Sequence, residues 1–124
     1  VGAVLVKDGL IVATAHNQPI LTNDATAHAE IQLIRIAGEK LKNYRLTDTS
    51  LYVTLEPCIM CFGAIINARI KRIIFGAYDS KTGVGESCLH IIDSHSIKHQ
   101  VKITGGVLEK ECSYMLQKFF KIRR

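Results

Sequence analysis

Two short motifs contain the side chains best suited to metal chemistry. The first is His-Ala-Glu, from His28 to Glu30, and the second is Pro-Cys-Ile-Met-Cys, which contains Cys58 and Cys61. A catalytic zinc ion takes three protein ligands in tetrahedral geometry, leaves its fourth position to water, and accepts imidazole nitrogen and thiolate sulfur. We therefore predict that His28, Cys58 and Cys61 bind one zinc ion. Such a site supports hydrolysis by a metal-activated water molecule.

Glu30 is predicted to carry protons in that reaction. Zinc lowers the pKa of bound water from about 15.7 to roughly 7, so that hydroxide forms at neutral pH. Hydrolytic deamination of a ring also requires protons to move from the water to a ring nitrogen and then to the leaving amine. This transfer needs a carboxylate that lies close to the metal without binding it. Glu30, two residues after His28, is the candidate.

Each motif alone has a plainer explanation. A His-Ala-Glu at a helix start is usually a cap or a surface feature, and a Cys-x-x-Cys pair can be a redox motif or half of a structural zinc site. No second pair of that kind occurs in the sequence. The combination of His-x-Glu with Pro-Cys-x-x-Cys is the signature of zinc-dependent nucleobase deaminases. The two motifs together therefore predict a deaminase, although iron or cobalt also binds such ligands.

The first motif stands at the start of a predicted helix. Before it, Asp8-Gly9 is a typical hairpin turn between two β-compatible runs. After it, apolar residues recur at helical spacing as far as Gly38. In chain order, the expected elements are strands at 1–6 and 10–15, a loop over 17–26, and a helix that has His28 and Glu30 in its first turn and ends at Gly38.

The second motif joins a strand to a buried helix. Pro57 suits the first position of a helix, and the residues after it are so apolar that the helix must be mostly buried. A strand, helix, strand succession implies parallel strands with a right-handed crossover, so we expect a mixed sheet. The elements expected here and beyond are a strand at 51–55, a helix at 58–69, a strand at 70–77, a loop at 78–87, a helical turn at 89–92 and a strand at 101–103.

The chain is expected to end in an amphipathic helix that packs on the sheet. Its apolar stripe has spacings of four, three and four residues, at Leu108, Cys112, Met115 and Phe119. The neighbouring Phe120 points elsewhere and is available to stack on a base. The basic residues at the end of this segment either contact nucleic-acid phosphates or form a solvated helix end placed favourably on the helix dipole. They are Lys118, Lys121, Arg123 and Arg124.

Composition favours one folded, soluble domain. The chain has 124 residues, of which 48% are hydrophobic and 22% charged, and we expect 1–124 to be a single domain. The longest apolar stretch is too short for a membrane-spanning helix, which needs about 20 residues. The net charge of +5 favours an anionic partner. Free cysteines without any sign of an oxidising compartment favour the cytoplasm.

Nearly the whole sequence resembles the bacterial tRNA-specific adenosine deaminases. Besides the two metal motifs, the resemblance covers segments without metal ligands, at 1–6, 17–20, 43–46, 79–83 and 119–120. It implies a cytidine deaminase-like fold, a three-layer α/β/α arrangement with a five-stranded mixed sheet. It also implies one zinc ion per subunit, a homodimer, and conversion of the wobble adenosine in a tRNA anticodon stem-loop to inosine.

The same resemblance assigns roles to individual residues. It makes His28, Cys58 and Cys61 the zinc ligands and Glu30 the proton shuttle, while the activated water attacks C6 of the flipped adenine. An adenosine in a loop is already poorly paired, so flipping it out costs less than opening a duplex. The positions that match contacts to the flipped base or its neighbours are Asn17, Asp79, Lys81, Phe120 and Arg123.

The sequence departs from this family at three places. Members carry an amphipathic helix before the first strand, and its absence here is expected to expose sheet surface and weaken the dimer. Val1 is not an initiator methionine, so we expect residues upstream of it. Ala25 stands where proline is common, and Tyr78 replaces an arginine of some members. None of these changes touches the predicted metal ligands.

Two other functions stay open at this point. An enzyme of the same fold could act on a free base or nucleotide of the guanine or cytidine type, and the basic end would then be incidental. Alternatively, the chain could be a non-catalytic RNA-binding subunit with a structural zinc ion. Glu30 argues against this last hypothesis, because a structural site has no use for a carboxylate that does not bind the metal.

Overall fold

The fold is built on a mixed sheet. The structure is a computed structural model that describes residues 1–79 and 101–123, apart from the side chains of Pro19 and of 120–123. The five strands lie in the order β2-β1-β3-β4-β5. β1 is antiparallel to β2 and β3, whereas β4 is parallel to β3 and β5. They are β1 (Gly2–Lys7), β2 (Leu10–His16), β3 (Thr49–Leu55), β4 (Arg72–Ala77) and β5 (Lys102–Thr104). The prediction of a five-stranded mixed sheet is confirmed.

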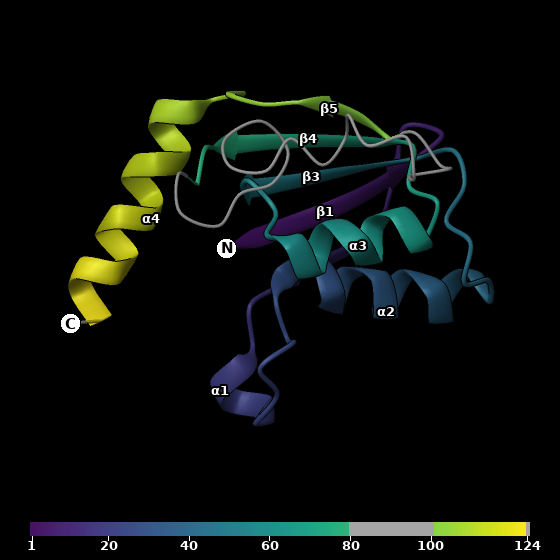
Figure 1. Ribbon diagram of the computed structural model, residues 1–124, viewed down its shortest axis with the longest axis horizontal. Helices are drawn as coiled ribbons and strands as arrows, with labels where there is room; N and C mark the ends of the chain where they lie inside the picture. The colour runs from purple at the N-terminus through teal and green to yellow at the C-terminus, as the bar shows by residue number, and fades with distance from the viewer. Residues whose placement is uncertain (80–100, 124) are drawn as a thin grey trace.

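Helices contact both faces of this sheet. The helices of the described residues are α1 (Pro19–Thr22), α2 (Ala29–Leu41), α3 (Ile59–Asn67) and α4 (Glu109–Arg123). Figure 1 shows α2 and α3 side by side along one face, and α4 at the end of the sheet where β4 ends. Within the described ranges, none of these helices is long and apolar enough to cross a membrane.

Local sequence explains both halves of the sheet. Asp8 and Gly9 have positive φ angles of 53° and 75°, as the two central residues of a type I′ hairpin turn require. They allow β1 and β2 to pair directly. β3 and β4 are connected through α3, which provides the crossover that parallel strands need.

The core lies between the sheet and the pair α2 and α3. Leu5, Leu51 and Ile73 are aligned across three neighbouring strands and are all buried. They belong to one cluster with Leu33 of α2 and Ile65 of α3. Successive residues of a strand point to opposite faces, so this row directs one face of the sheet toward the two helices. The core thereby fixes both helices on the sheet.

The opposite face is approached by α4 at a glycine. Phe75 lies in the core, so the next residue, Gly76, points to the other face. A Cβ atom at Gly76 would clash with Sγ of Cys112 on α4, and it would lie 2.7 Å from the Cβ atom of that cysteine and 3.0 Å from the backbone oxygen of Thr54. The absence of a side chain at Gly76 therefore lets α4 approach β4 closely.

The apolar stripe expected on α4 is mostly wrong. Leu108, which precedes the helix, is 67% exposed, and Met115 and Phe119 are 54% and 48% exposed. Cys112 does pack against the sheet, and among the side chains of this helix that the structure describes, Leu116 is the buried apolar one. Because α4 packs through the small side chain of Cys112 on Gly76, the face that it turns to the sheet is not the one with its largest apolar side chains.

Several predicted boundaries also differ. α2 continues through Gly38 to Leu41, and Lys42 ends it with a φ of 52° and an N–H that bonds to the carbonyls of Gly38 and Glu39. Pro57 lies before α3, because Cys58 is the N-cap of that helix. The loop predicted over 17–26 contains α1, and the strands predicted at 70–77 and 101–103 begin at residues 72 and 102. The predicted turn at 89–92 lies outside the described residues.

Gly76→Ala should destabilise the protein, because the added methyl group overlaps Cys112. We expect the free energy of unfolding to fall by about 1–3 kcal/mol, as for other overpacked positions. Gly63→Ala is the matched control, since no atom beyond its chain neighbours and the backbone of its own helix lies within 4 Å of its added Cβ atom. That change in a helix should raise stability by about 0.5–1 kcal/mol. Urea unfolding measures both variants, and an unchanged midpoint for Gly76→Ala would contradict the close approach.

Candidate active site

The N-termini of two helices lie close together, and each helix begins directly after a predicted metal ligand. His28 is the N-cap of α2 and Cys58 is the N-cap of α3, both with an extended backbone. Neither side chain makes a capping hydrogen bond. α3 then brings Cys61 onto the same face, one turn after Cys58. Because helix N-termini carry partial positive charge, this position favours thiolate sulfur.

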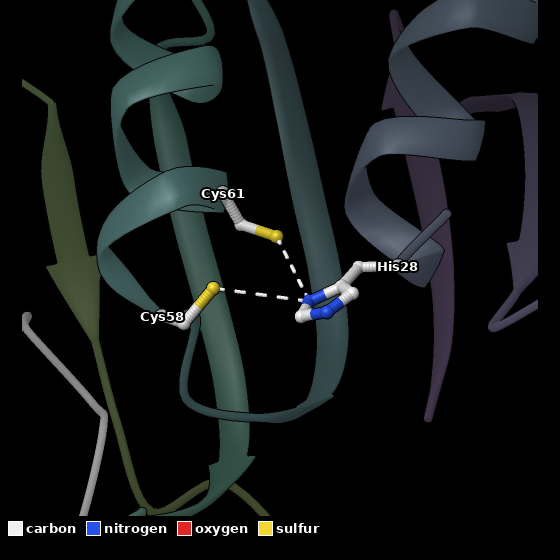
Figure 2. Close-up of side chains that lie close together, drawn as sticks. All are labelled: His28, Cys58 and Cys61. Atoms are coloured by element: carbon white, nitrogen blue, oxygen red, sulfur yellow. Dashed lines mark hydrogen bonds between the residues drawn. The ribbon is translucent and has the colours of Figure 1, made fainter. Parts of the chain in front are cut away.

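The three predicted ligands converge on a common point (Figure 2). The Nδ1 atom of His28 lies 3.5 Å from Sγ of Cys61 and 3.8 Å from Sγ of Cys58. All three ligand atoms lie within 4.8 Å of one another. Ordinary Zn–N and Zn–S bonds at a tetrahedral angle place nitrogen and sulfur about 3.6 Å apart. The donor set and its spacing therefore fit a zinc ion.

The two cysteines share one proton. A hydrogen bond from the Cys61 thiol lowers the pKa of Cys58 to about 5, although partial burial of Cys58 acts in the opposite direction. The same bond and burial raise the pKa of Cys61. At neutral pH the pair therefore consists of a thiolate at Cys58 and a thiol at Cys61. A metal that binds both sulfur atoms must displace the remaining proton.

Glu30 lies beside the three ligands without being one of them. The group of converging ligand atoms contains His28, Cys58 and Cys61 but not Glu30. Its side chain is only 4% exposed. Burial raises the pKa of Glu30, and the charge of Cys58 adds to this effect. A carboxyl group with a raised pKa both accepts and returns a proton more readily near neutral pH.

A pocket opens onto these groups. It is lined by Val1, Asn17, His28, Glu30, Leu55, Glu56, Cys58 and Asp79. Two of the predicted substrate contacts, Asn17 and Asp79, thus share one pocket with Glu30 and with two of the predicted ligands, His28 and Cys58. Lys81 lies outside the described residues. Phe120 and Arg123 belong to α4, but their side chains are outside the description as well.

Glu56 is a pocket residue to which the sequence analysis assigned no role. Its side chain is 2% exposed. One carboxylate oxygen accepts the backbone N–H of Asp79 at 3.0 Å, and its own N–H donates to the carbonyl of Ala77 at 2.8 Å. Glu56 therefore ties the end of β3 to the residues that follow β4. A charged residue between an apolar strand and a predicted ligand was the signal available in the sequence.

Sequence comparison identifies relatives along the whole chain. The family described as MafB19-like deaminase matches residues 1–124. A tRNA-specific adenosine deaminase from Haemophilus influenzae is 50% identical over 125 residues, which cover 100% of this chain and 72% of the relative. The motif residues thus lie within a similarity that extends far beyond the metal site.

Structural comparison identifies solved deaminase structures of more than one kind. A structure from a study of A-to-I editing by tRNA:A34 deaminases at the wobble position of transfer RNA has a TM-score of 0.88 and 45% identity, covering 91% of this chain and 82% of the other. A guanine deaminase from Bacillus subtilis has a TM-score of 0.63 and 35% identity, covering 94% and 76%. The predicted α/β/α fold is confirmed, and the similarity to the tRNA enzyme is greater.

Zinc binding should release a proton, because Cys61 is a thiol before it becomes a ligand. We expect calorimetric titrations of the metal-free protein in buffers of different ionisation enthalpy to give about one proton from the thiol pair per zinc ion near pH 7. Zinc affinity should fall as the pH falls, since protons compete for the sulfur. Cys112→Ala, which removes a remote thiol, should behave like the unchanged protein. Proton-independent binding would contradict the shared proton.

Glu56→Leu should destabilise the pocket, because the partly buried N–H of Asp79 would lose its acceptor. Leaving such a group unpaired costs about 1–3 kcal/mol. Glu56→Gln keeps a side-chain oxygen at the same place and should lose less. Urea unfolding of the two variants gives the comparison. Equal losses would show that charge at Glu56, rather than this hydrogen bond, is what the structure requires.

Proposed function

Because this chain belongs to the MafB19-like deaminase family together with the tRNA-specific adenosine deaminases, we propose that it converts adenosine in transfer RNA to inosine. The supporting observation is the convergence of His28, Cys58 and Cys61 beside the buried carboxyl group of Glu30. The reaction adds water at C6 of adenine and releases ammonia. We propose the wobble adenosine of an anticodon stem-loop as the substrate, in line with the A34 deaminases that share this fold.

His28, Cys58 and Cys61 are the residues that would hold the metal, and the nitrogen and sulfur donors favour zinc. When bound, zinc lowers the pKa of a water molecule toward 7 and so provides a nucleophile at neutral pH. The chain's own contribution at this point is orientation. The helix starts of α2 and α3 hold the three ligand atoms close together, and His28 and Cys58 line the pocket that would receive the base.

Glu30 moves the protons of the reaction. Its carboxylate takes a proton from the attacking water and passes it to the ring nitrogen N1, so that the C6–O bond can form. It then takes the remaining proton from the new hydroxyl group at C6 and delivers it to the amino group, so that the C6 carbonyl forms as the C6–N bond breaks and ammonia leaves. Its raised pKa suits this task, because a buried carboxyl group holds a proton longer than an exposed one.

Recognition of the RNA involves residues around the same pocket. We propose that Asn17 and Asp79, which line it, contact the flipped base or its neighbours. Lys81, Phe120 and Arg123 complete the proposed contacts, and the positive charge of the chain favours the phosphate backbone. Since the substrate is transfer RNA, we place the protein in the cytoplasm.

A homodimer is part of the proposal. Large apolar side chains are exposed on α1 and at the first residue of α3, namely Ile20, Leu21 and Ile59. Such side chains are available for burial against a second copy of the chain. Sedimentation of the protein at several concentrations measures this association.

Deamination of a free base is the alternative function, supported by the fold shared with a guanine deaminase. The two functions differ in which parts of the substrate the chain contacts, since a free base has no phosphates for basic residues to bind. Turnover of guanine or cytidine well above the rate on an anticodon stem-loop would favour this alternative. The non-catalytic RNA-binding subunit is disfavoured by the placement of Glu30 in the pocket.

Glu30→Gln should greatly slow inosine formation while leaving the metal in place. We expect the rate to fall by roughly 10²–10⁴-fold, because the amide cannot transfer the protons. Mass spectrometry of nucleosides from an anticodon stem-loop with adenosine at the wobble position measures the product. Glu39→Gln, an exposed glutamate on the same helix, is the matched control and should retain full activity. Inosine from Glu30→Gln at the normal rate would contradict the assignment.

A further inference from the structure

The first turn of α2 lacks the side-chain hydrogen bond that the N-cap residue of a helix usually provides. The N–H groups at the start of a helix have no acceptor within the helix, and the side chain of the N-cap residue usually supplies one. Here the N-cap is His28, which makes no such bond. Its Nδ1 atom instead faces the sulfur atoms of Cys58 and Cys61. An acceptor must therefore come from elsewhere.

Asn17 supplies that acceptor from the loop after β2. Its Oδ1 atom accepts the backbone N–H of Ala29, the first residue of α2, at 2.8 Å. The next residue holds the loop in place. The N–H of Gln18 donates to the carbonyl of Ala27 at 2.8 Å, and its Oε1 atom accepts Nε2 of Gln32 at 3.2 Å. The turn that contains His28 and Glu30 is thus braced from outside the helix.

This bond also determines how the amide of Asn17 is oriented. Because the N–H of Ala29 is a donor, the amide oxygen must face it, and the NH₂ group takes the other position. Asn17 lines the pocket together with His28 and Glu30. Its NH₂ group is therefore the part of the side chain left to donate to an acceptor on a bound nucleoside, such as a ring nitrogen or a ribose oxygen.

We infer that Asn17 is a positioning residue that couples substrate recognition to the metal-binding turn. Its oxygen caps α2 in place of His28, and its NH₂ group binds the substrate. A substrate that accepts a hydrogen bond from the NH₂ group therefore binds the same amide whose oxygen holds the turn of His28 and Glu30 in position. The substrate half of this inference rests on the proposed function, whereas the capping half does not.

The capping half is tested without RNA. In Asn17→Ala, we expect the amide of Ala29 to exchange with solvent at least tenfold faster by NMR, because its acceptor is gone. Zinc affinity, measured by competition with a chelator, should fall by roughly 10–100-fold, the usual effect of losing a partner that orients a metal ligand. Asn43→Ala is the matched control. It removes a comparable bond, from the N–H of Arg45 to an asparagine oxygen at 2.9 Å, in a loop outside the pocket.

Asn17→Asp separates the two halves. A carboxylate keeps the acceptor for Ala29 but has no NH₂ group, so we expect normal exchange of the Ala29 amide together with a loss of at least tenfold in kcat/KM on the anticodon stem-loop. The added negative charge can itself strengthen zinc binding. Amide exchange, rather than zinc affinity, is therefore the readout of the cap in this variant.

Each outcome decides a part of the inference. If Asn17→Ala leaves both Ala29 exchange and zinc affinity as in Asn43→Ala, Asn17 does not position the turn. If Asn17→Ala does not fold, rapid exchange of Ala29 in Asn17→Asp would overturn the cap. Full RNA activity in Asn17→Asp would overturn the substrate half. Absence of inosine with the unchanged protein would instead refute the proposed function, and the exchange measurements would still decide the cap.

Discussion

The meeting of two helix N-termini is the constraint on which the rest of the structure depends. α2 and α3 run in the same direction over one face of the sheet, so that His28 and Cys58 face each other (Figure 1). The partial positive charge of both helix ends favours a thiolate between them. Because both N-cap side chains turn toward the metal position, the first turns cannot be capped in the ordinary way. The surrounding loops must then supply hydrogen bonds that most helices obtain locally.

The site also buries carboxyl groups that water would otherwise stabilise. Glu30 and Glu56 are almost completely inaccessible, yet both have hydrogen bonds that offset part of the desolvation. For Glu30 the remaining cost of desolvation serves the proposed reaction, because it raises the pKa of the group that transfers protons. For Glu56 the use is mechanical, because a buried carboxylate holds the residues after β4 beside the pocket. Catalytic groups and their supports thus occupy positions where apolar packing would give greater stability.

The sequence predicted much of the fold because its signals were local. Asp8-Gly9 specified a hairpin, and runs of β-compatible residues specified the strands that line the core. The errors had local and tertiary causes. Gly38 did not end α2, because the helix continues to Leu41 and ends at Lys42, which takes the left-handed conformation that glycine was expected to supply. The stripe on α4 was misjudged because a close approach of Cys112 to Gly76 determines which face of the helix meets the sheet.

For the site, the sequence by itself determined the types of ligand and their spacing, since two cysteines three residues apart at a helix start must share a face. It also determined that a glutamate follows the histidine closely, which limits where that carboxyl group can lie. Only the tertiary structure decided that Asn17 caps α2 and that Glu56 holds Asp79. Such bonds join one residue's side chain to another residue's backbone, and every residue except proline has a backbone N–H. No residue type or periodicity therefore marks the partner, and the pairing exists only once the strands and helices are packed.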